Sequence, residues 1–150
     1  MALTSLVVDA RPAQVFAVLS DGWNYADWVV GAVHIRAVDP HWPAVGAQVH
    51  HKVGAWPAMI ADATEVTGCD PGGLLSLRAG VWPLGEASVQ VNWRAVSDSR
   101  TLVTMVEDLT AGPMLAARNK LNDLVLHFRN KESLRRLADM TRRYPDATLP

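Results

Sequence analysis

The sequence has little cysteine, no long apolar run and no excess of positive charge, and each shortage excludes a class of protein. Cys69 is the single cysteine among 150 residues, so no internal disulfide can form. No apolar run approaches the roughly 20 residues of a membrane-spanning helix, and the first residues lack the basic-then-apolar layout of a signal peptide. We therefore expect a cytoplasmic protein that does not insert into membranes.

The charge pattern argues against nucleic acid as a partner. Fourteen basic residues against fifteen acidic ones give a net charge of −1, which provides no positive field to attract phosphate backbones. Acidic residues also interrupt the cluster of basic residues late in the chain, so we interpret this cluster as a solvated helix face. Its members are Arg129, Lys131, Arg135, Arg136, Arg142 and Arg143, with Glu132 and Asp139 between them.

Signatures of cofactor and metal binding are missing as well. The sequence has no glycine-rich phosphate loop, no dinucleotide fingerprint and no nucleophile elbow, so we expect no cofactor. His50 and His51 stand next to each other, but neighbouring strand residues point to opposite faces and cannot readily share one ion. We therefore expect no metal site.

What is present predicts one compact domain over residues 1–150. Hydrophobic residues make up 49% of the chain and charged residues 19%, a balance that can fill a core. No Ser/Gly/Pro-rich stretch and no block of like charge divides the chain.

Periodicity predicts the order of the elements. Alternation over residues 3–9 predicts a strand, Pro12 suits the first turn of a helix, and residues 23–31 are typical of a second short helix closed by glycine. Period-two patterning between turn residues predicts six more strands over residues 33–110. Residues 121–143 contain good helix formers and no glycine or proline, so they predict a long helix.

This order predicts an α+β helix-grip fold. It would be a seven-stranded curved antiparallel sheet wrapped round a long C-terminal helix, with two short helices after the first strand. The apolar residues of the long helix change sides midway, so we expect the helix to contact more than one surface. Leu121, Leu124, Val125 and Phe128 share one side, and Leu126, Leu134, Leu137 and Ala138 share another.

Segments spread over essentially the whole chain resemble a known superfamily. They are PAQVFAVL (12–19), DGW (21–23), WVVG (28–31), WPAVG (42–46), HHKVG (50–54), WPLG (82–85), TMVED (104–108), GP (112–113) and RNKESLRRL (129–137). Through them the chain resembles the SRPBCC superfamily, also called START-like or Bet v 1-like, and within it the bacterial polyketide cyclase/dehydrase group. The resemblance implies a deep pocket between sheet and helix that takes lipids, hormones or aromatic polyketides. It also implies that a minority of the superfamily are enzymes that cyclise, aromatise or dehydrate such ligands.

Polar side chains are predicted to face this pocket. Alternation from Val53 directs His51 inward, and alternation from Met105 does the same for Glu107. Asn130 lies in the middle of the apolar stripe of the long helix. We expect the ligand to contact His51, Trp56, Val89, Val91, Trp93, Val103, Met105, Glu107, His127 and Asn130.

These residues allow three functions. The leading one is the binding of a small hydrophobic or aromatic molecule, lipid-like or polyketide-like. The first alternative is a polyketide cyclase, aromatase or dehydratase in which Glu107, with a pKa raised by burial, and His51 are the acid and the base. In the other interpretation Glu107 and His51 do not catalyse a reaction. They are hydrogen-bonded, as buried polar groups nearly always are, and they contact the ligand. The weaker alternative is a homo-oligomeric interaction module, a homodimer that buries one side of the long helix.

Overall fold

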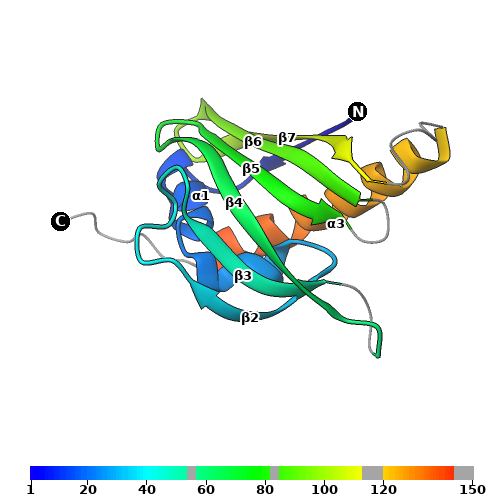
Figure 1. The fold of residues 1–150 in the computed structure, drawn as a ribbon. Coiled ribbons are helices and arrows are strands. Elements are labelled where there is room, and N and C mark those ends of the chain that lie inside the picture. Colours follow the sequence, from blue (N-terminus) through cyan, green and yellow to red (C-terminus); the bar gives the residue numbers. More distant parts are fainter. Residues whose placement is uncertain (54–56, 82–84, 113–119, 144–150) are drawn as a thin grey trace.

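The computed structural model describes residues 1–53, 57–81, 85–112 and 120–143, and its elements follow the order that the sequence predicts (Figure 1). Most bounds lie within a few residues of the expected ones. The helical segments of this part of the chain are α1 (Pro12–Leu19), the 3-10 turn η1 (Gly22–Asn24), α2 (Tyr25–Trp28) and α3 (Lys120–Arg143). Its strands are β1 (Ala2–Val8), β2 (Ala32–Val38), β3 (Gln48–Val53), β4 (Ile60–Asp70), β5 (Leu74–Val81), β6 (Gly85–Ser97) and β7 (Arg100–Ala111).

The strands form one seven-stranded antiparallel sheet in the order β1-β7-β6-β5-β4-β3-β2. Strands that follow each other from β2 to β7 pair with each other, and β1 joins the far side of β7. Figure 1 shows the sheet curving round α3, which crosses its concave side. The predicted α+β helix-grip fold is therefore confirmed.

The sheet bends at places where the pairing register slips. Slips occur between Val66 and Gly68 in the β4–β5 pair, and between Ala95 and Ser97 in the β6–β7 pair. Such irregularities increase the local twist of a strand and let it bend. A bent sheet and a straight helix diverge along their length, which leaves space for a cavity between them.

Alternation on β6 explains how the sheet buries one face. Ala87, Val91 and Trp93 are buried, whereas Ser88 and Gln90 between them are exposed. A strand with one apolar and one polar face is typical of an antiparallel sheet that is covered on one side only. The cover here comes from the helices.

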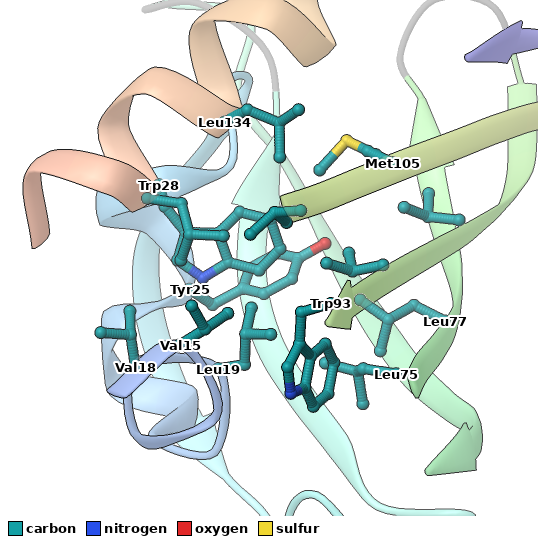
Figure 2. Packing of buried hydrophobic residues seen from close by; sticks show 14 of the residues in the cluster. Val15, Val18, Leu19, Tyr25, Trp28, Leu75, Leu77, Trp93, Met105 and Leu134 are labelled. Carbon is teal, nitrogen blue, oxygen red and sulfur yellow. The ribbon is translucent and has the colours of Figure 1, made fainter. Parts of the chain in front are cut away.

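Helix α1 fills one end of the space under the sheet. Val15, Val18 and Leu19 are buried in the same core cluster as Trp93, and Figure 2 shows them gathered beside it. Phe16 stacks on Trp93 with ring centroids 5.9 Å apart and an interplanar angle of 20°. Side chains of α1 and β6 therefore pack against each other at this end.

Helix α3 is apolar on two sides, as its sequence predicts. Leu126, Leu134 and Leu137 are buried toward the sheet, whereas Leu124 and Phe128 are exposed.

Within residues 1–53, 57–81, 85–112 and 120–143, every helix is too short or too polar to span a bilayer.

Candidate functional site

A cavity of about 220 Å³ lies between the concave face of the sheet, the connection from α2 to β2, and α3. A cavity of about 150 Å³ is enough to hold a benzene molecule, so this one has room for a ligand of one or two rings. It is lined by Tyr25, Trp28, Val29, Val30, Gly31, Ala32, His51, Val53, Leu77, Ala79, Gly80, Val89, Met105, Glu107, Arg129, Asn130 and Ser133.

Most of the wall is apolar. Trp28 comes from α2, Leu77 and Ala79 from β5, Val89 from β6 and Met105 from β7. The strand residues alternate along their strands, so the same periodicity that buries the sheet's inner face also builds this wall. An apolar wall with a few polar groups is typical of small-molecule sites.

One polar group of the cavity is the carboxyl group of Glu107 on β7. Its side chain is 2% exposed, and Oε1 lies 3.9 Å from Nη1 of Arg129 on α3. Burial raises the pKa of Glu107, and the charge of Arg129 and the amide of Asn130 only partly oppose this rise. The carboxyl group therefore holds a proton more readily than it would in water.

Glu107 and Asn130 also present atoms without a partner. Oε2 of Glu107 and Nδ2 of Asn130 are buried and have no partner with hydrogen-bonding distance and angle among the described residues, although the Asn130 amide lies near enough to the carboxyl group to lower its pKa. Both residues line the cavity, Glu107 from the sheet and Asn130 from the helix. Buried polar groups in proteins nearly always have a partner, so the open acceptor and the open donor at this cavity are positions for a bound water or for the polar group of a ligand.

A second polar cluster is uncharged and fully hydrogen-bonded. Nε2 of His51 lies 2.9 Å from Oγ1 of Thr64, and that oxygen lies 3.0 Å from the hydroxyl group of Tyr25. Nδ1 of His51 lies 3.3 Å from the carbonyl oxygen of Lys52. Burial lowers the pKa of His51 and raises that of Tyr25 to about 12, so both rings are neutral near neutral pH.

The rings of this cluster also pack on each other. Tyr25 stacks on His51 with ring centroids 5.3 Å apart, and Trp28 meets Tyr25 edge to face at 5.6 Å. Figure 2 shows the Tyr25 ring beside Trp28 with its hydroxyl group directed into the fold. The short helix α2 is thus held to β3 and β4 by stacking and by hydrogen bonds.

The connection from α2 to β2 covers one side of the cavity and is fastened to α3. The Val30 amide donates to Oγ of Ser133 at 3.1 Å, and Nη2 of Arg129 donates to the Val30 carbonyl oxygen at 3.2 Å. Gly31 follows with a φ of 96°, a left-handed conformation that favours glycine. Arg129 therefore lies between the covering segment and Glu107.

A family model matches nearly the whole of this chain. The model is that of polyketide cyclase/dehydrase and lipid transport proteins, and it matches residues 3–141. The chain belongs to this family. No curated protein matches the chain.

Solved structures share the fold of this family member. The Zhui aromatase/cyclase from Streptomyces sp. R1128 is 16% identical with a TM-score of 0.69, and the match covers 98% of this chain and 96% of that one. A conserved protein from Geobacillus kaustophilus is 13% identical with a TM-score of 0.71, over 94% of each chain. The di-domain ARO/CYC BexL from the BE-7585A biosynthetic pathway is 17% identical with a TM-score of 0.71, over 94% of this chain and 46% of that one. At these identities the likeness concerns the fold.

The structure brings five of the predicted contact residues together in the cavity of this family member. They are His51, Val89, Met105, Glu107 and Asn130. The sequence signals that found them were strand alternation and helical spacing, which both report direction relative to the core.

Four further predicted residues lie elsewhere, so the predicted set was too wide for this cavity. Val91, Val103 and Trp93 are buried in the core cluster and do not line the cavity, and Trp93 stacks on Phe16 of α1. His127 lines a separate groove between β1 and α3, with Nδ1 3.3 Å from Oγ1 of Thr4. Trp56 lies outside the described residues.

Sequence reasoning missed other lining residues. The charge pattern predicts that Arg129 is solvated, but its side chain is only 23% exposed and reaches Glu107 and Val30. Leu77 could have been found, since residues 75, 77 and 79 alternate on β5. Nothing in the local sequence marks Tyr25 as a wall residue, because its place depends on how α2 packs against β3.

Proposed function

We propose that the protein binds a small, largely apolar molecule of one or two rings that carries a hydroxyl or keto oxygen. One observation carries this proposal: in an apolar cavity of about 220 Å³, the carboxyl Oε2 of Glu107 and the amide Nδ2 of Asn130 have no partner among the described residues. Membership of a family that includes lipid transport and polyketide cyclase proteins supports the same class of ligand.

The two open atoms suit a hydroxyl group. A ligand hydroxyl can donate to Oε2 of Glu107 and accept from Nδ2 of Asn130 at the same time. A keto oxygen is the other fit, because it can accept from Asn130 and from a protonated Glu107. A ligand carboxylate fits poorly, since it would bring a second negative charge next to Glu107 in a buried site.

Binding is favoured over catalysis by the hydrogen bonds of His51. A general base must have a nitrogen within reach of the ligand, but both ring nitrogens of His51 lie at hydrogen-bonding distance from Thr64 and Lys52. Polyketide cyclisation or dehydration is the second candidate, because the similar Zhui structure is that of an aromatase/cyclase. A homodimer is proposed on separate grounds, the exposed side of α3.

Calorimetry with 2-naphthol tests the binding proposal, and 2-methoxynaphthalene is the matched ligand that lacks the donor. We expect 2-naphthol to bind with a dissociation constant on the order of 10 μM, and the methyl ether about tenfold more weakly. Asn130→Leu keeps the size of the side chain and should bring the two ligands closer together in affinity. No binding, or equal binding of both ligands to the wild type, would contradict the proposal.

A separate experiment distinguishes binding from catalysis. If a substrate is found and these two residues are its acid and base, Glu107→Gln and His51→Gln should each lower the single-turnover rate by about 10²–10⁴-fold. The affinity for the substrate should stay near normal. A contact residue should instead change the affinity and leave the rate nearly unchanged. A large rate loss in both variants would make the protein an enzyme.

A further inference from the structure

In the part of the chain that the structure describes, the first half of α3 has large apolar side chains that are exposed. Leu121 is 64% exposed, Leu124 49%, Val125 44% and Phe128 62%. Leu3 on β1 is 58% exposed and lines the same groove as Phe128. These five residues are called the α3 patch below.

The α3 patch is a stripe of its own and does not extend the core. The four helix residues follow the spacing i, i+3, i+4 and i+7, which places them on one side of a helix. Leu126 and Asn130 lie on the opposite side, where they face the core and the cavity. Contact with the sheet therefore leaves the patch uncovered.

A groove runs along the edge of the α3 patch. It has a volume of about 440 Å³ and lies between β1 and the middle of α3. Leu3, Leu6 and Phe128 contribute apolar walls, and Lys131 and Glu132 stand at its rim. A surface that is both apolar and hollowed offers room for protruding side chains of a partner.

The size of the α3 patch fits a second copy of the chain. Five large apolar side chains, each roughly half exposed, present on the order of 500 Å² of apolar surface. A standard interface buries about 800 Å² on each partner, of which about 60% is apolar. The patch therefore holds about the apolar area that one side of a stable homodimer needs.

The charges around the α3 patch allow two copies to approach each other. Glu132 at the groove pairs with Arg135 at 2.8 Å and with Arg136 at 3.1 Å, so its carboxylate already has partners within one copy and needs none across an interface. The net charge of −1 adds little repulsion between copies. A two-fold axis would also place the apolar stripe of one helix on the same stripe of the other.

We propose that the protein forms a homodimer through the α3 patch, with the two α3 helices crossing at Leu124, Val125 and Phe128. The cavity lies on the opposite side of the helix and stays accessible in both copies. This arrangement does not depend on which ligand the cavity holds.

Sedimentation velocity between 1 and about 100 μM protein tests the proposal. The wild type should sediment as a dimer at the upper concentrations. The double variant Leu124→Ser/Phe128→Ser should raise the dimer dissociation constant by about 100-fold or more, because a few central, well-packed residues carry most of an interface's binding free energy. Ile60→Ser/Val96→Ser is the matched control, since both residues are exposed and lie outside the patch. Its dissociation constant should equal that of the wild type.

Far-UV circular dichroism and thermal unfolding of each variant show whether the protomer is folded. A folded, monomeric patch variant beside a dimeric control supports the interface. A wild type that stays monomeric at 100 μM would overturn the proposal, as would a patch variant that dimerises as tightly as the wild type. Patch-dependent binding of a monomer to vesicles that contain anionic lipid would overturn it in favour of a membrane-facing surface.

Discussion

Glu107 and Arg129 face each other across the cavity wall with 3.9 Å between Oε1 and Nη1, but burial affects them unequally. The carboxyl group is 2% exposed and the guanidinium group 23%. Burial therefore costs the carboxylate more hydration free energy than the attraction to Arg129 offsets. Its pKa rises despite the nearby positive charge. The balance between these two residues sets the charge of the site.

The raised pKa of Glu107 predicts a pH dependence of stability. Its folded pKa lies above the ordinary value of 4.5, so its contribution is fully present below pH 4.5 and is lost as pH rises through the folded pKa. Glu107→Gln should remove this loss and be the more stable of the two proteins at neutral pH. Urea unfolding of both proteins from pH 4 to pH 8 measures the difference.

Subtracting the unfolding free energy of Glu107→Gln from that of the wild type at each pH separates the contribution of Glu107 from that of His51. Burial lowers the pKa of His51, so its contribution to stability is present above pH 6.5 and is lost as pH falls below that value. Both proteins contain His51, so the pH dependence of stability that His51 causes cancels in the difference. Glu86→Gln, which removes a half-exposed carboxyl group on β6 outside the cavity, is the control for the substitution itself. An equal effect of both variants would contradict the assignment.

Arg129 should control the release of a ligand. Arg129→Met removes the hydrogen bond to the Val30 carbonyl oxygen and leaves Glu107 without its positive neighbour. We expect 2-naphthol to dissociate about fivefold faster in stopped-flow fluorescence, because a lost hydrogen bond corresponds to roughly 1 kcal/mol. Arg94→Met, at an exposed position on β6, should leave the rate unchanged. Equal rates in wild type and Arg129→Met would show that residues 29–31 do not hold the ligand in.

Thr64 should be important for stability because it has two buried partners. Thr64→Val keeps the shape of the side chain but leaves His51 and Tyr25 without their shared hydrogen-bond partner. The free energy of unfolding should fall by about 1–3 kcal/mol, measured by urea denaturation. Thr104→Val is the matched control on β7, because the hydroxyl group of Thr104 lies 3.0 Å from that of Ser5 at an exposed site, and its loss should cost about 0.5 kcal/mol or less.

Two tryptophans should respond differently to a ligand. Trp28 lines the cavity, whereas Trp93 packs against Phe16 at the end that α1 fills. A bound aromatic molecule should quench Trp28, so the fluorescence change should largely disappear in Trp28→Phe and persist in Trp93→Phe. The reverse result would place the ligand at the α1 end.

Local patterns explain why the fold could be predicted. The alternation on β6 and the uninterrupted helix formers of α3 each determine an element without knowledge of its neighbours. The antiparallel meander then follows because consecutive strands pair. The register slips that curve the sheet leave no such pattern, and they could not be predicted.

The site could be predicted only in part. The local sequence determines whether a side chain points toward the core, but it does not determine which part of the core that side chain reaches. Alternation correctly directs both Val89 and Trp93 inward on β6, but only Val89 reaches the cavity. Trp93 lies four residues further along, where α1 packs against the sheet. Arg129 was missed for a similar reason, since its inward course depends on Val30 and Glu107, which are distant in sequence.

The most direct test of the central claim is the methyl NMR spectrum of ¹³C-methionine protein during a titration with 2-naphthol. Met105 on β7 lines the cavity, whereas Met140 on α3 packs against the core and is not part of the cavity wall. The variants Met105→Leu and Met140→Leu assign the two methyl signals. A bound ring should shift the Met105 methyl resonance in a saturable manner and leave that of Met140 unchanged. No saturable shift at Met105, or a shift at Met140 alone, would contradict binding in this cavity.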